Sequence, residues 1–327
     1  MRLKAVLPLL LVLSVAVPAA RAQGVQAFMA QPSKVDPAVT QFDDQNVILL
    51  GGGKHAPLVV FFTGTGGKPE WSIPFLTVIA EQGYNVIALA YDDAPSVSAV
   101  CPQDPDPDCS RKFRQMRIYG TGGPAPVSNP VAESIQVRLA ELLRALARSQ
   151  PDAGWDAFLN GDAPRWDQIV VSGLSQGAGM AALIAKQTLT RRVVLFSSPW
   201  DVTGPDHHPA PWLSEPSATP MDRWFAEYHR QERTAPLIVA GYAALGVPPD
   251  HILVFDNALP PGSPLSGSDN PYHLSTIEDP AYADRWRQMF GQAADFELNP
   301  APAHPGECRD PDHKAQGLSN SAEDFSC

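Results

Sequence analysis

One serine of the chain sits in a pattern that could make its hydroxyl a nucleophile. Ser175 lies in the stretch VVSGLSQGAG, with Gly173 two residues before it and Gly177 two residues after it. A serine hydroxyl attacks a carbonyl carbon only when a neighbouring base removes its proton. Glycines at this spacing are typical of a sharp strand-to-helix turn that lifts the hydroxyl clear of a sheet. The same pattern also forms plain packing turns, so the other groups that this chemistry needs must be found elsewhere.

A base for this serine is expected late in the chain. Where such a serine is used, the order is nucleophile, acid and then histidine, with the histidine after the last strand. The last apolar run typical of a strand is HILVFD, residues 251–256. His273, His304 and His313 follow it, and the last two lie in a polar, proline-rich tail. His273 is therefore the predicted base.

Three carboxylates are candidates for the acid that would orient His273. Glu232 is the first choice if residues 223–232, RWFAEYHRQE, contain a strand. Asp201, at the end of the preceding apolar run, and Asp256, one strand later, are the alternatives. The acid must reach the distal nitrogen of the imidazole, fix its tautomer and stabilise the imidazolium.

Two backbone amides are predicted to hold the oxyanion that forms during such an attack. One belongs to the residue after the nucleophile, Gln176, and the other to the loop after an earlier strand. The glycine-rich loop at 63–67, TGTGG, follows the apolar run PLVVFF, which makes the amide of Thr65 the second donor. A phosphate-binding loop is the competing interpretation, but Lys68 is followed by Pro69 instead of the Ser or Thr of that motif.

Strands and helices are predicted to alternate around these residues. Continuous apolar runs typical of buried strands occupy residues 57–62, 85–91, 168–174, 192–201 and 251–256. Helical spacing of apolar residues marks residues 71–84, 130–149, 177–189 and 236–247. This alternation predicts an α/β fold with a mostly parallel central sheet flanked by helices. Ligands bind beyond the carboxyl ends of such strands, and Ser175 lies at one of these ends.

A long stretch between two of these elements is expected to be irregular. Residues 92–128 are rich in Pro, Gly and Asp, and they contain Cys101 and Cys109. The chain has two more cysteines, Cys308 and Cys327. We expect local disulfides, Cys101–Cys109 and Cys308–Cys327, the second tying down a C-terminal tail at 300–327. No metal site is predicted, although the acidic loop at 101–109 leaves a calcium ion open.

The first 22 residues have the features of a secretory signal peptide. Arg2 and Lys4 precede an apolar run that ends in Ala20-Arg21-Ala22, a small-x-small cleavage site. We therefore expect a secreted or periplasmic protein with one catalytic domain, residues 23–327, and no stable membrane anchor. Cleavage removes three basic residues and no acid, so the net charge falls from −11 to −14. So acidic a protein is a poor candidate for binding nucleic acid or an anionic membrane.

Aromatic residues and a loop near the predicted site could border the part of the substrate pocket that holds the acyl group. Trp71 follows the glycine-rich loop, and Trp200 follows the strand at 192–201. The proline-rich residues 203–222 are expected to form a surface loop or lid. Aromatic side chains supply apolar area to binding pockets, but they are equally common as ordinary core or surface residues.

The chain resembles the α/β-hydrolase superfamily from about Pro57 to His273 and beyond. More narrowly, FFTGTGGKP, the Cys-bearing acidic insertion, VVSGLSQGAG and VLFSSPWD resemble secreted bacterial serine esterases and hydrolases of unassigned substrate. That group typically has Pro where Thr63 stands here, and Asp where Glu232 stands. The second departure puts the acid in doubt.

The resemblance implies hydrolysis of a small-molecule or polymeric carboxylic ester, with no cofactor. One fold hosts many chemistries, so several alternatives stay open. The same site could serve an acyltransferase, a peptidase or a polyester depolymerase. The scaffold could also belong to a non-catalytic binding protein.

Overall fold

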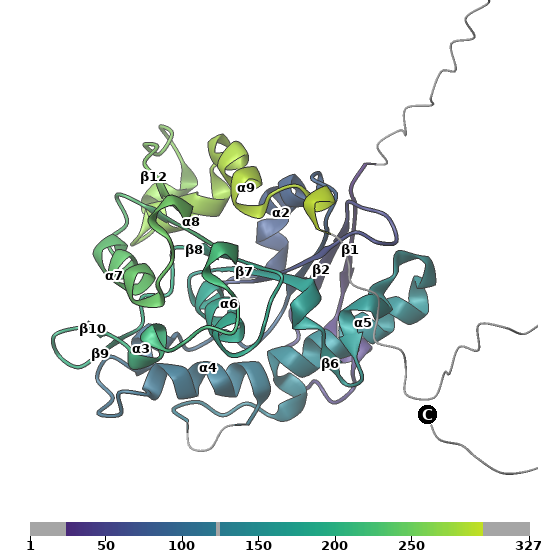
Figure 1. The fold of residues 1–327 in the computed structure, drawn as a ribbon, viewed down its shortest axis with the longest axis horizontal. Helices are drawn as coiled ribbons and strands as arrows, with labels where there is room; N and C mark the ends of the chain where they lie inside the picture. The colour runs from purple at the N-terminus through teal and green to yellow at the C-terminus, as the bar shows by residue number, and fades with distance from the viewer. Residues whose placement is uncertain (1–23, 122–124, 297–327) are drawn as a thin grey trace, which may run out of the picture.

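One mostly parallel sheet forms the centre of the molecule (Figure 1), in a computed structural model that describes residues 24–121 and 125–296. Its eight strands lie in the order β1-β2-β4-β3-β7-β8-β11-β12. Strand β2 is antiparallel to β1 and β4, and all other neighbours are parallel. The strands are Gln26–Ala30 (β1), Asn46–Leu50 (β2), Leu58–Phe62 (β3), Asn85–Leu89 (β4), Ile169–Leu174 (β7), Arg192–Phe196 (β8), Trp224–His229 (β11) and Ile252–Phe255 (β12).

Helices cover both faces of this sheet (Figure 1). Alternate residues of β3 enter two separate cores: Val60 and Phe62 belong to one, Val59 and Phe61 to the other. The first core includes side chains of Cys109–Tyr119 (α4), Ile135–Ser149 (α5), Gln176–Gln187 (α6) and Ala235–Leu245 (α7). The second includes side chains of Ile73–Ala80 (α2), Pro271–Glu278 (α8) and Ala283–Phe290 (α9). The central strands β4, β3, β7 and β8 are buried on both faces and mainly apolar, which is why their runs were visible in the sequence.

The predicted fold class is confirmed, and the ambiguous residues 223–232 do contain a strand, β11. Strands β1 and β2 were missed. Strand β1 has exposed residues along its length, so it lacks a continuous apolar run. The connection between them contains a short helix, Pro32–Val35 (α1).

The prediction that residues 92–128 are irregular is wrong for part of that stretch. It contains a short helix, Val97–Val100 (α3), and the longer α4. Two of the buried positions of α4 are arginines, Arg114 and Arg117. Because these side chains are buried through pairing with carboxylates, the apolar spacing that marks a helix was interrupted.

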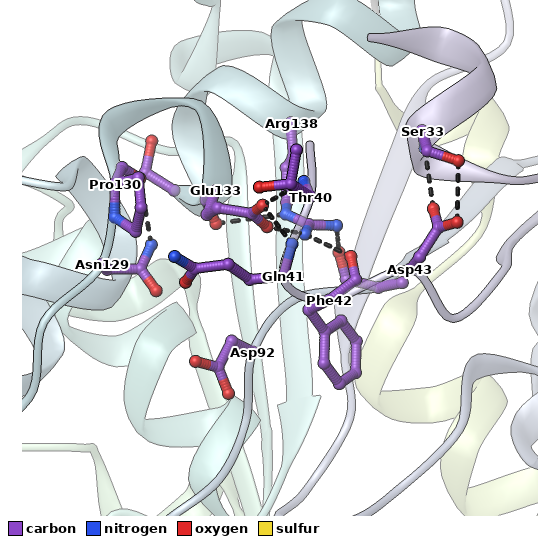
Figure 2. Close-up of polar contacts among 12 residues, drawn as sticks. Ser33, Thr40, Gln41, Phe42, Asp43, Asp92, Asn129, Pro130, Glu133 and Arg138 are labelled. Carbon is purple, nitrogen blue, oxygen red and sulfur yellow. Dashed lines mark hydrogen bonds and ion pairs between the residues drawn. The ribbon is translucent and has the colours of Figure 1, made fainter. Parts of the chain in front are cut away.

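A buried ion pair fastens the N-terminal segment to α5 (Figure 2). The Glu133 carboxylate accepts hydrogen bonds from the amides of Thr40 and Gln41 at 2.6 and 2.8 Å, and it pairs with Arg138. Arg138 also donates to the carbonyl of Ala90 at 3.2 Å. Arg138 on α5 therefore holds the residues that follow β4. These residues lead to Asp93, which contacts the glycine-rich loop.

The disulfide Cys101–Cys109 is formed, as predicted. Cys308 and Cys327 lie outside the described residues, as do the signal peptide expected at 1–22 and the tail expected at 300–327. No helix within residues 24–121 and 125–296 is long and apolar enough to cross a membrane.

The segment expected as a lid contains local structure. Val202–Thr203 (β9) and His208–Pro209 (β10) pair as a short antiparallel ribbon. Further along, Trp212 is buried, and the ammonium group of Lys186 on α6 donates to the carbonyl of Leu213 at 2.8 Å.

Candidate active site

Ser175 occupies a strained turn between β7 and α6. Its backbone has φ 55° and ψ −121°, a conformation that residues other than glycine rarely adopt. The turn has no room for side chains on either side of the serine. A Cβ at Gly173 would lie 2.4 Å from the carbonyl carbon of Gly177, and a Cβ at Gly177 would lie 2.1 Å from the carbonyl oxygen of Phe62. Both glycines of the motif are therefore required by the close approach of the backbone.

His273 and Glu232 meet beside this turn. The Nδ1 atom of His273, in the first turn of α8, lies 2.8 Å from Oε2 of Glu232, which follows β11. The Glu232 side chain is fully buried, and that of His273 is 14% exposed. The other carboxylate oxygen of Glu232 accepts from the Ser197 hydroxyl at 2.6 Å and from the amide of His229 at 2.7 Å. With Glu232 ionised, the proton of the imidazole lies on Nδ1, and Nε2 is left as an acceptor.

The two alternative acids lie elsewhere. Asp201 forms a buried ion pair with Arg114, whose Nε donates to Oδ2 of Asp201 at 2.8 Å. Trp212 donates to the same oxygen at 3.1 Å. Asp256 is exposed at the end of β12 and forms no hydrogen bond to His273. The structure therefore brings Glu232 to the imidazole and keeps Asp201 and Asp256 away from it.

The glycine-rich loop packs against the serine turn. A Cβ at Gly64 would lie 3.1 Å from the Cβ of Ser175, which shows how closely the two backbones approach. Within the described part of the chain, the amides of Thr65 and Gln176 form no hydrogen bond, and both residues line a pocket that Ser175 also lines. Both predicted oxyanion donors are therefore next to the serine.

A buried carboxylate that the sequence did not single out holds this loop in place. Oδ1 of Asp93 accepts from the amide of Gly66 at 3.0 Å, and Oδ2 lies 3.4 Å from the hydroxyl of Thr63. Burial raises the pKa of Asp93 to about 6, and the two hydrogen bonds oppose part of that rise. The side chain of Gln176 reaches the same region, because its amide group donates to the carbonyl of Asp93.

The order of these groups along the chain matches that of one known fold. Ser175 follows β7, Glu232 follows β11 and His273 follows β12, the arrangement of a serine turn, an acid and a late histidine on one open sheet. This chain has the α/β-hydrolase fold.

Other α/β-hydrolase structures resemble it at low identity. A carboxyl esterase from the fungus Tuber melanosporum is 11% identical, with 84% of this chain and 90% of that chain covered and a TM-score of 0.41. A carboxylesterase cloned from a metagenomic library is 12% identical, with 85% and 90% covered and a TM-score of 0.43. A fluorophosphonate-binding serine hydrolase of Staphylococcus aureus is 10% identical, with 82% and 98% covered and a TM-score of 0.42.

Comparisons of the amino-acid sequence with family models and with curated proteins found no match. At the identities above, the similar structures decide nothing about what this α/β-hydrolase fold acts on.

Two pockets meet at Ser175. The larger has a cavity volume of about 250 Å³ and is bordered by the glycine-rich loop, Trp71, Leu174 and His273. The smaller, of about 30 Å³, is bordered by Gln176, Trp200 and the residues around Cys101. Both tryptophans that the sequence pointed to therefore line a pocket at the serine. No hydrogen bond joins Ser175 to His273 among the described residues, but both border the larger pocket.

In the acidic loop that left a calcium ion open, two of the three carboxylates are paired with basic residues. Asp106 pairs with Lys112, and Asp108 pairs with Arg111, each at 2.5 Å. Among residues 24–121 and 125–296, no group of three or more His, Cys, Asp or Glu side chains is placed to hold a metal ion.

Proposed function

We propose that this protein is a serine hydrolase that cleaves carboxylic esters, with Ser175 as nucleophile, His273 as base and Glu232 as the orienting acid. The observation that carries the proposal is the 2.8 Å hydrogen bond between His273 and a fully buried Glu232, at a cavity that Ser175 borders. Such a pair fixes the tautomer that accepts a proton at Nε2 and stabilises the imidazolium.

In the first half of the reaction, Oγ of Ser175 bonds to the ester carbonyl carbon while its proton passes to Nε2 of His273. The carbonyl oxygen takes up the electron pair of the double bond, and the amides of Thr65 and Gln176 donate to it. The carbon–oxygen bond to the alcohol then breaks, and the imidazolium gives its proton to the departing oxygen. An acyl group remains on Ser175.

In the second half, water attacks the acyl carbon and passes a proton to His273. The bond to Oγ breaks, the proton returns to Ser175, and a carboxylic acid leaves. The net reaction is ester plus water to acid plus alcohol, and it needs no cofactor.

Export is part of the same proposal. It is supported by the leader expected at 1–22 and by the disulfide Cys101–Cys109, since such bonds persist in oxidising compartments.

The experiment is labelling with a fluorophosphonate probe, mapping of the modified residue, and assay of a panel of esters. We expect the label on Ser175, and a Ser175→Ala variant that keeps its fold but loses at least ~10⁴-fold of the esterase activity. Retained turnover by that variant would contradict the proposal. An unlabelled protein that binds esters without turnover would favour a non-catalytic binding protein.

A further inference from the structure

The two pockets at Ser175 differ in size and in chemistry. The larger is walled by apolar side chains, among them Phe61, Leu274 and Ile277. The smaller has serine side chains in its wall, including Ser98 and Ser110. An ester has two parts, on either side of the carbonyl carbon, so the two pockets would hold different parts of one substrate.

The position of His273 tells the two pockets apart. His273 borders the larger pocket and not the smaller one. During ester cleavage the imidazolium must hand its proton to the oxygen of the departing alcohol, so that alcohol lies on the histidine side. The acyl group then extends into the smaller pocket, past Gln176.

We propose that the smaller pocket holds the acyl group and limits it to a short chain, and that the larger pocket holds an apolar, ring-bearing alcohol. This rests on the proposed function and specifies its substrate class. The smaller pocket has a cavity volume of about 30 Å³, and a group the size of a water molecule needs about 10–15 Å³ of cavity volume. The pocket therefore has room for two or three such groups, as in an acetyl or propionyl group.

The wall of the smaller pocket is tied down, so it does not widen for a longer chain. The side-chain oxygen of Gln176 accepts from the amide of Val97 at 2.7 Å, which fixes α3 to the serine turn. The disulfide Cys101–Cys109 closes the next part of the wall. Arg114, which also lines the pocket, is held by its buried pair with Asp201.

Trp71 lies in the wall of the larger pocket and is the aromatic side chain that would face the substrate. Trp71 is 61% exposed, more than any other large hydrophobic side chain of the described residues. An exposed aromatic face at a cavity beside a nucleophile offers a stacking surface for a ring. We therefore assign Trp71 to the alcohol part of the substrate.

Four esters with alkoxide leaving groups of similar reactivity test this assignment: ethyl acetate, 2-phenylethyl acetate, ethyl octanoate and 2-phenylethyl octanoate. We expect kcat/KM for 2-phenylethyl acetate to exceed that for 2-phenylethyl octanoate by at least about 100-fold. It should exceed that for ethyl acetate by about 10-fold, the effect of partly burying one ring.

Variants separate the two pockets. Trp71→Ala should bring the ratio of 2-phenylethyl acetate to ethyl acetate close to one, whereas Leu189→Ala, at a residue that is 42% exposed and borders neither pocket, should leave it unchanged. The double variant Cys101→Ala/Cys109→Ala should lower the ratio of acetate to octanoate. If that variant does not fold, Ser98→Leu fills the same pocket, and it should reduce turnover of both acetates without changing the preference for the ring.

Labelling by a fluorophosphonate reports on the proposed function separately. A labelled enzyme that prefers ethyl octanoate, or whose four rates are equal, overturns the assignment of the pockets and leaves the hydrolase proposal standing. A protein that is neither labelled nor active on any of the four esters overturns both.

Discussion

Glu227 and Glu232 lie on either side of one hydroxyl, that of Ser197. The hydroxyl oxygen is 2.6 Å from Oε1 of Glu232 and 3.4 Å from Oε1 of Glu227. Glu227 is fully buried, and burial followed by the nearby charge of Glu232 raises its pKa well above the usual range for a glutamate. A hydroxyl has one proton to donate, and the shorter distance directs it to Glu232. Glu227 is then the protonated partner, which can donate to Ser197.

Glu227→Gln should therefore keep kcat/KM within about threefold of the parent, because an amide N–H can replace the carboxylic acid proton. Glu227→Leu should lower kcat/KM by at least about tenfold, because Ser197 loses a donor and the carboxylate that orients His273 loses its support. Steady-state kinetics on both variants check this. Equal losses in the two variants would mean that Glu227 acts as a charged group.

Glu232→Gln should lower kcat by about 10⁴-fold, since an amide facing Nδ1 favours the wrong tautomer of His273. Asp256→Asn is the matched control, and kcat should stay within about twofold because that side chain is exposed and is not the partner of the imidazole. Asp201→Asn should instead lower the free energy of unfolding by about 3–5 kcal/mol, because it leaves Arg114 buried without a charge partner. A stably folded Asp201→Asn that loses kcat as strongly as Glu232→Gln would contradict this division.

Ser175 and His273 could be proposed from sequence as nucleophile and base because the strands before them, β7 and β12, are visible as apolar runs. The acid was uncertain because β11 alternates buried and partly buried residues, so residues 223–232 read equally as strand or helix. The contact between Glu232 and His273 joins residues 41 positions apart, and only the folded sheet brings them together.

The residues that support the candidate site show no sequence pattern from which their roles could be predicted. Asp93 and Ser197 sit in loops after strands, where a polar residue is ordinary, and their roles depend on neighbours distant in sequence. Arg114 interrupts the apolar spacing that would predict α4 from sequence. A buried arginine is interpreted as a surface residue until its partner, Asp201, is known.

Asp93 predicts a pH dependence of stability. Its pKa is about 6 in the folded protein against 3.8 for an ordinary aspartate, with burial as the main cause. The folded state therefore binds the proton more tightly, and this contribution to stability is present below pH 3.8 and is lost as the pH rises through about 6. Asp93→Asn keeps an acceptor for Gly66 but does not titrate.

The melting temperature of Asp93→Asn relative to the parent should consequently increase between about pH 4 and pH 7. Thermal unfolding of both proteins across this range measures the difference. A difference that stays constant with pH would show that the carboxyl group has an ordinary pKa.

Gly177→Ala should lower the free energy of unfolding by at least about 3 kcal/mol, because the added methyl meets the backbone oxygen of Phe62 at 2.1 Å. Gly267→Ala is the control, since a Cβ there meets nothing within 4 Å, and it should change stability by no more than about 0.5 kcal/mol. Denaturant unfolding measures both. The loss at Gly177 should be the same when Ser175 is already alanine.

The crowding around Gly173 and Gly177 also bears on how this gene would change under selection. Neither glycine contributes an atom to the proposed reaction, yet the backbone of the turn excludes any side chain at either position. A lineage that lost its activity would therefore keep both glycines for as long as the protein folds. Among paralogues of this gene, the G-x-S-x-G signature would mark inheritance of the scaffold. Retention of the pair Glu232 and His273, which the backbone of the turn does not require, would distinguish enzymes from inactive descendants.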